Sequence, residues 1–278
     1  MADYIEIPTE NGTFDALTAG EPDGRPVLLL HGFPEAAIQW SEQLPVLAEA
    51  GCRAVAPDQR GYSPGARPEN VFDYRVEALV DDVLAIADEL GWQRFDLVGH
   101  DWGAAVSWAV AAFHPDRVRS LTAVSVPHPD PFGQAVREDE DQAQRSGYMQ
   151  VFQSKSAEKA LLDEDAKKLR SIYERRVPAE HVEDYVRRLS EPGALTAALN
   201  WYRAMRYSGR IGPVRVPTLY VWSTEDAAVG STAAFACEEY VQAPYRFEML
   251  EDVSHWVPEE TPETMSRLIL ENLHAHQG

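Results

Sequence analysis

The stretch LVGHDWGAA, residues 97–105, has the pattern of a strand that turns directly into a helix. Gly99 lies two residues before Asp101, and Gly103 lies two residues after it. Small residues at these positions frame a nucleophile elbow, a strained turn that places one side chain above the edge of a parallel sheet. Serine usually occupies the centre of this turn, whereas this chain has a carboxylate there. An aspartate after a strand more often caps the next helix, but the paired glycines make Asp101 the candidate nucleophile.

The segments around this turn alternate between strand and helix patterns. Strands buried on both faces of a sheet are predicted by the apolar runs at residues 27–30, 53–57, 95–98 and 121–126. Between them, residues 76–90 place their apolar side chains along one helical stripe, and Gly91 predicts the end of that helix. This alternation predicts an α/β fold with a parallel sheet, in which ligands bind at the carboxyl ends of the strands.

The alternation stops at residues 126–132, VPHPDPF, where three prolines predict a break in both sheet and helix. From there to about residue 210 the sequence has helix patterns only. Strand patterns return at residues 218–222 and 245–250, and a last helix is predicted from about Thr261. We therefore predict a helical insert over residues 130–212, which divides the core into residues 1–129 and 213–278.

Composition and charge limit the classes of function. The chain has 278 residues and a formal net charge of −20, so we expect neither nucleic acid nor an anionic membrane as a partner. Its two cysteines, Cys52 and Cys237, match no metal or redox spacing and are expected to be buried thiols. The beginning of the chain lacks a basic region followed by an apolar core, so no signal peptide and a cytoplasmic location are expected.

A carboxylate at the elbow suits attack on a saturated carbon atom that carries a leaving group. The product would be an alkyl ester of the enzyme, one of the covalent intermediates that carboxylates form. This ester must then be hydrolysed, and that step needs a water molecule, a base that activates it and donors for the developing oxyanion.

The sequence contains candidates for each of these parts. His255 in VSHWVPEE follows the last predicted strand and is the candidate base, and Asp226 in VWSTEDAAV follows the strand before it and would orient the imidazole. Asp130, after an earlier core strand, is the alternative acid. The backbone N–H groups of Phe33 and Trp102 are the candidate oxyanion donors, and such donors typically contribute about 3 kcal/mol each.

Four of these segments resemble those of a known family. HGFPE at 31–35, GHDWGAA at 99–105, the strand that carries the acid and SHW at 254–256 are similar to the α/β-hydrolase-fold epoxide hydrolases, over essentially the whole chain. Haloalkane and haloacetate dehalogenases are close kin that use the same aspartate. The resemblance implies the α/β-hydrolase fold, a mostly parallel eight-stranded sheet flanked by helices, with a helical cap inserted after the sixth strand.

The resemblance also assigns two tyrosines in the helical insert. In the family, two cap tyrosines bind the epoxide oxygen and donate a proton to it. NWYR at 200–203 is similar to the second tyrosine motif and assigns Tyr202, while GYMQVFQ at 147–153 resembles the first and assigns Tyr148. Without the other residues, both would be interpreted as core aromatics of the cap. The expected substrate pocket is lined by Phe33, Pro34, Trp102, Phe152 and Trp201.

We therefore predict an epoxide hydrolase that converts a small apolar epoxide and water to a vicinal diol, with no metal or other cofactor. The sequence leaves a homodimer open. A dehalogenase on the same frame is the first alternative, because the indole N–H of Trp102 could hold a halide. However, Phe33 has no side-chain N–H, and Trp102 stands where the haloacetate branch has an arginine, so both positions favour the epoxide. A ligand-binding protein without catalytic activity on the same scaffold is the remote alternative.

Overall fold

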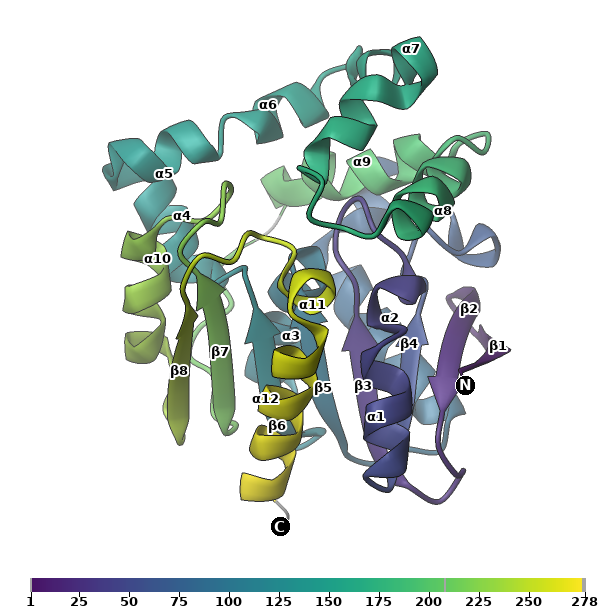
Figure 1. Cartoon of the computed structure of the whole chain (residues 1–278), viewed down its shortest axis with the longest axis vertical. Helices are drawn as coiled ribbons and strands as arrows, with labels where there is room; N and C mark the ends of the chain where they lie inside the picture. The colour runs from purple at the N-terminus through teal and green to yellow at the C-terminus, as the bar shows by residue number, and fades with distance from the viewer. Residues whose placement is uncertain (1, 208, 277–278) are drawn as a thin grey trace.

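A computed structural model describes residues 2–207 and 209–276 of the chain. Its centre is one sheet of eight strands in the spatial order β1-β2-β4-β3-β5-β6-β7-β8 (Figure 1). The strands are β1 Asp3–Thr9, β2 Gly12–Ala19, β3 Arg25–Leu30, β4 Cys52–Pro57, β5 Phe95–His100, β6 Val118–Val124, β7 Thr218–Ser223 and β8 Tyr245–Leu250. Among the described strands, the six from β3 onward are parallel, whereas β1 pairs with β2 and β2 with β4 in antiparallel fashion. The mostly parallel eight-stranded sheet confirms the predicted α/β-hydrolase fold.

Helices cover both faces of this sheet, as the unbroken apolar strands require. In β3, Val27 and Leu29 pack in one core cluster, whereas Leu28 and Leu30 pack in the other. The first cluster includes α1 Gln43–Glu49 and α12 Pro262–Ala275, and the second includes α2 Val76–Glu89, α3 Trp102–Phe113 and α10 Ser231–Ala236. The helix predicted over residues 76–90 is confirmed, and Gly91 after it has φ +74°.

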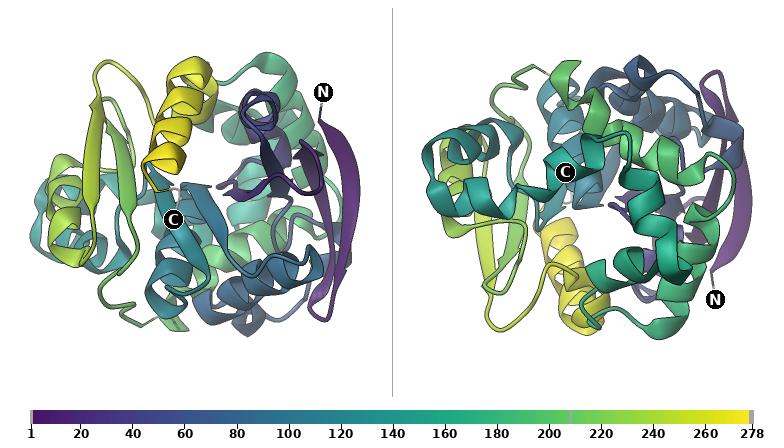
Figure 2. Two further views of the ribbon diagram at one scale, coloured as in Figure 1. Left: turned by 90° about the horizontal axis from the view of Figure 1, so that it is seen from below. Right: turned by 90° about the horizontal axis from the view of Figure 1, so that it is seen from above.

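The chain between β6 and β7 contains six α-helices among the described residues, which we call the cap helices. They are α4 Pro129–Glu138, α5 Glu140–Arg145, α6 Tyr148–Gln153, α7 Ala157–Ile172, α8 Ala179–Leu189 and α9 Ala194–Ala204. Figure 1 shows most of them in a layer above the sheet, and Figure 2 shows this layer from above. The prediction of helices alone in this part of the chain is confirmed, whereas the division at residues 130 and 212 stays a prediction.

The sequence does not predict one feature of the fold, and one expectation from it is wrong. The hairpin of β1 and β2 was not predicted, because these strands lie at the sheet edge and are partly exposed rather than apolar throughout. The prolines at residues 126–132 do not exclude a helix, since α4 begins at Pro129. Proline fits the first helical turn because the N–H groups there have no partner within the helix.

Two further findings concern the cysteines and the described helices. Cys52 and Cys237 are both buried free thiols, as predicted. In the part of the chain that the structure describes, no helix combines the length and the apolar character needed to cross a membrane.

Candidate active site

Asp101 lies in the sharp turn between β5 and α3, where the sequence predicts it. Its backbone has φ 52° and ψ −120°, a conformation that is unfavourable for any residue other than glycine. The neighbouring glycines allow this turn to pack against the sheet. A Cβ atom on Gly99 would lie 2.3 Å from the carbonyl oxygen of Gly103, and one on Gly103 would lie 2.2 Å from the carbonyl oxygen of Leu30. The turn therefore depends on glycine at both positions.

We expect Gly103→Ala to lower the free energy of unfolding by about 2–3 kcal/mol or more, because its Cβ would collide with backbone rather than with a movable side chain. Gly133→Ala is the matched control, since Gly133 is also helical and a Cβ there would meet only the Arg137 guanidinium at 3.5 Å. Helix propensity predicts that this control gains up to about 1 kcal/mol. Denaturant unfolding of both variants measures the difference, and equal stabilities would contradict the packing argument.

The carboxylate of Asp101 is held at both oxygen atoms. The backbone N–H of Phe33 donates to Oδ1 at 2.7 Å, and Nε2 of His255 lies 3.5 Å from Oδ2. Burial alone would raise the pKa of Asp101, but the hydrogen bond and charge of His255, with the Phe33 amide, bring it below the ordinary value. Asp101 is therefore ionised at neutral pH, which is the state that a nucleophile requires.

His255 is paired with Asp226 on its other side. The two side chains follow β8 and β7, whose carboxyl ends are neighbours in the parallel sheet. His255 Nδ1 lies 2.8 Å from Asp226 Oδ2, and Asp226 Oδ1 accepts the backbone N–H groups of Ala228 at 2.8 Å and Val229 at 2.9 Å. The aspartate is fully buried and satisfied at both oxygens, so its orientation is fixed.

The two carboxylates decide the charge of His255. Burial would lower the pKa of this imidazole, but the charge of Asp226, the hydrogen bonds to both aspartates and the charge of Asp101 raise it to about 10. His255 is therefore an imidazolium between two carboxylates at neutral pH. When the Asp101 charge is removed, as in an ester of that residue, the pKa of His255 falls and the imidazole becomes available as a base.

Asp130, the alternative acid, lies elsewhere. Its carboxylate accepts the backbone N–H groups of Ile211 and Gly212 at 3.3 and 3.4 Å and pairs with Arg210. These contacts join the two chain segments that connect the cap helices to the core. The contact with His255 is made by Asp226 instead.

The two predicted oxyanion donors lie beside Asp101. The Phe33 amide already donates to its carboxylate, as described above. Trp102 is the first residue of α3, so its amide is one of the helix N-terminal N–H groups that lack a partner within the helix. The partial positive charge at this helix end favours negative charge nearby.

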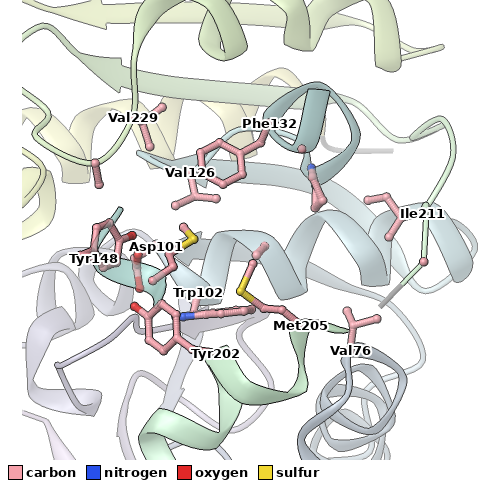
Figure 3. Close-up of a pocket in the computed structure, with 16 residues that line it drawn as sticks. Val76, Asp101, Trp102, Val126, Phe132, Tyr148, Tyr202, Met205, Ile211 and Val229 are labelled. Carbon is pink, nitrogen blue, oxygen red and sulfur yellow. The ribbon is translucent and has the colours of Figure 1, made fainter. Parts of the chain in front are cut away.

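The cap helices bring Tyr148 and Tyr202 to the same place. Tyr148 is the first residue of α6, and Tyr202 is in the last turn of α9. Their rings are 6.2 Å apart at an interplanar angle of 78°, and both line the two cavities that reach Asp101. Figure 3 shows the two tyrosines and Asp101 together at one end of the larger cavity. Burial and the nearby Asp101 charge raise the pKa of both phenols, so both stay protonated at neutral pH.

Two cavities meet these residues, with volumes of about 210 Å³ and 170 Å³. The larger one is lined mainly by apolar side chains, among them Val76, Val126, Phe132, Met205, Ile211 and Val229 (Figure 3). The smaller one is lined by Phe33, Phe152, Ile172, His255 and Trp256, among others. Such lining favours apolar groups on a ligand. The titratable side chains that line the two cavities are Asp101, Tyr148, Tyr202, Glu174 and His255.

Of the five residues predicted to line the substrate pocket, three line one of these two cavities. Phe33 and Phe152 line the smaller cavity, and Trp102 lines the larger one. Pro34 and Trp201 line neither of these cavities. The Trp201 indole N–H instead donates to the carbonyl of Arg60 at 2.9 Å, and the Pro34 carbonyl accepts the Tyr173 hydroxyl at 2.7 Å.

The sequence does not predict the role of three buried polar residues behind His255, which are His100, Gln39 and Glu35. His100 Nε2 lies 2.8 Å from the His255 carbonyl oxygen, so this nitrogen carries a proton and donates it. Burial and the charge of His255 lower the pKa of His100 to about 3, so the imidazole is neutral and Nδ1 is an acceptor. Gln39 Nε2 lies 2.6 Å from this Nδ1 atom, and Glu35 Oε2 lies 3.0 Å from it. Burial also raises the pKa of Glu35, so a protonated carboxyl can donate there. These residues support the backbone of His255. In the sequence, Glu35 and His100 could have been noticed because they lie within HGFPE and GHDWG.

Comparisons with known proteins identify the family of the chain. Residues 25–262 match the model of the alpha/beta hydrolase fold family. The chain is 33% identical to the AB hydrolase superfamily protein YfhM of Bacillus subtilis, over 96% of both chains. It is also 33% identical to epoxide hydrolase 3 of Xenopus tropicalis, over 96% of this chain and 76% of that one.

A solved structure is similar over nearly its whole length. This structure, of an epoxide hydrolase from metagenomes of hot environments, superposes on the present one with a TM-score of 0.87 at 27% sequence identity. The matched region covers 98% of this chain and 99% of the solved one. The family match and the extent of these similarities show that the chain belongs to the epoxide hydrolases of the α/β-hydrolase-fold family.

Proposed function

We propose that this enzyme hydrolyses an epoxide to a vicinal diol through a covalent ester on Asp101. The observation that carries the proposal is the position of two protonated phenols, Tyr148 and Tyr202, on the same cavities as the ionised Asp101. A nucleophile on one side and proton donors on the other are what the opening of a three-membered ether requires.

In the first step, a carboxylate oxygen of Asp101 attacks one ring carbon of the epoxide. The C–O bond of that carbon breaks, and its electron pair moves to the epoxide oxygen. A phenol of Tyr148 or Tyr202 donates its proton to this oxygen, while the other phenol donates a hydrogen bond to it. The product is a hydroxyalkyl ester of Asp101. Because the ester is uncharged, the pKa of His255 falls, and its imidazolium loses a proton to solvent while the phenolate takes one up.

In the second step, water attacks the carbonyl carbon of the Asp101 ester. His255 accepts a proton from this water, and Asp226 stabilises the imidazolium that forms. The backbone N–H groups of Phe33 and Trp102 donate to the oxyanion of the tetrahedral intermediate. Its collapse breaks the bond to the alkoxy oxygen, which takes a proton from His255 and leaves as the diol. The Asp101 carboxyl group then gives its proton to His255, which restores the carboxylate and the imidazolium.

The substrate that these cavities favour is a small apolar epoxide with aryl or alkyl substituents. The mechanism uses only side chains, backbone amides and water, so we propose that no cofactor takes part. A panel of aryl and alkyl epoxides, assayed for diol formation, tests the function. Halide release from short haloalkanes together with inert epoxides would establish the dehalogenase instead, and ligand binding without turnover of either class would favour a binding protein.

We expect Tyr148→Phe and Tyr202→Phe each to lower kcat/KM for epoxides by about 100-fold, since each removes one acid or hydrogen-bond donor from ring opening. Loss of both phenols is expected to abolish turnover. Tyr207→Phe is the matched control, because Tyr207 is an exposed tyrosine just beyond α9. Initial rates of diol formation measure the effect, and a double variant that keeps wild-type activity would refute the role of the phenols.

A further inference from the structure

The loop that carries Asp226 is held by a cap helix as well as by its own hydrogen bonds. Residues 226–230 lie between β7 and α10. Arg145 Nη1 in α5 donates to the backbone carbonyl of Asp226 at 2.6 Å. Gln142 in the same helix donates from Nε2 to the carbonyl of Ala228 at 2.9 Å, and its Oε1 accepts the N–H of Gly230 at 2.8 Å. Three hydrogen bonds from one short helix therefore hold both ends of the loop.

Gln142 is suited to fix this loop in a single position. Its side chain is fully buried, and its Nε2 also donates to Ser146 Oγ at 3.0 Å. Reversing the amide would place its NH₂ group against the N–H of Gly230 and its oxygen against the carbonyl of Ala228. Only one orientation therefore satisfies the buried backbone groups of the loop, and losing it leaves a buried donor and acceptor without partners.

The same segment leads directly to one of the tyrosines. Tyr148 follows Arg145 by three residues, and the carbonyl of Ser146 accepts the N–H of Met149 in the first turn of α6. Gln142 and Arg145 therefore connect the part of the cap that contains Tyr148 to the loop that contains Asp226.

We propose that Gln142 and Arg145 are positioning residues for the hydrolytic half of the reaction, through a clamp of α5 on the Asp226 loop. This inference rests on the proposed function. The pairing of Asp226 with His255 needs the loop at hydrogen-bond distance, and the clamp supplies three contacts that the core does not. When the clamp is lost, Asp226 orients His255 less well, and hydrolysis of the Asp101 ester slows while ring opening continues.

Gln142→Met tests this clamp, because it keeps the length of the side chain and removes all three of its hydrogen bonds. We expect the rate of ester hydrolysis to fall by about 10- to 100-fold, because small misplacements of catalytic groups slow reactions to this extent. If hydrolysis limits turnover, kcat and KM fall together and kcat/KM changes little. Rapid acid quenching and mass spectrometry should show a larger steady-state fraction of ester on Asp101. Gln144→Met in the same helix is the control, since Gln144 is exposed.

Arg145→Met and Arg145→Lys test the same clamp independently, even if Gln142→Met fails to fold. The methionine variant should show the same accumulation of ester, and the lysine variant, which keeps a cationic donor, should show less. Wild-type ester fractions in folded Gln142→Met and Arg145→Met would overturn the clamp, as would equal losses in kcat and kcat/KM without ester. Absence of ester in every variant, His255→Gln included, would instead refute the proposed function.

Discussion

Asp101→Ala is expected to lower kcat/KM for epoxides by about 10,000-fold or more, because it removes the group that forms the bond to the substrate. The two phenols and the apolar cavities remain, so the variant should still bind the epoxide. Initial rates of diol formation measure the first effect, and equilibrium binding of the epoxide measures the second. Asp81→Ala, at an exposed aspartate of α2, is the control for loss of a carboxylate.

The same variant tests the charge state of the site. Asp101 is one of two carboxylates that raise the pKa of His255 to about 10. Without Asp101 the imidazolium loses a hydrogen-bond partner and a negative charge, so the pKa of His255 should fall. An NMR titration of the imidazole measures this shift. Substantial diol formation by Asp101→Ala, or an unchanged pKa of His255, would contradict the assigned arrangement.

His255→Gln is expected to separate the two steps of the reaction. Glutamine cannot accept the proton of the attacking water, so diol formation should fall by about 1,000-fold or more. Ring opening slows less, because Asp101 and both tyrosines are still present. The ester should therefore accumulate until each molecule of enzyme carries one substrate, with a mass increase equal to the whole epoxide because ring opening releases nothing.

Peptide mapping of this trapped species should place the added mass on Asp101. His274→Gln, at an exposed histidine near the end of α12, should turn over like the wild type and accumulate no more ester than it does. Diol formation by His255→Gln at the wild-type rate, or an adduct on another side chain, would exclude the assigned base or nucleophile respectively.

The sequence predicts those parts of the site that follow from parallel strands. Asp101, Asp226 and His255 each come shortly after a predicted strand, and the carboxyl ends of parallel strands share one edge of the sheet. Their meeting at distances of 2.8 and 3.5 Å could therefore be expected from three local patterns. The tyrosines needed the family resemblance, because nothing in a helical pattern says which aromatic side chain faces the core of the cap and which faces the nucleophile.

Contacts between distant segments explain what the sequence did not predict. Trp201 was expected in the pocket, but its indole finds a carbonyl partner at Arg60, 141 positions earlier in the chain. The support of His255 by His100 and the clamp by Gln142 likewise join segments 155 and 86 or more positions apart. No sequence periodicity indicates the hydrogen-bond partner of a buried histidine or glutamine. Such contacts can be identified only from the folded structure, which brings the partners together.

The most direct test of the covalent route is a single turnover in water enriched in oxygen-18, with enzyme in excess over epoxide. Hydrolysis of the ester places the water oxygen in the Asp101 carboxylate and gives the diol an oxygen that came from Asp101. The account therefore predicts an unlabelled diol and a labelled peptide that contains Asp101. A diol that carries the label after the first turnover, with Asp101 unlabelled, would contradict it.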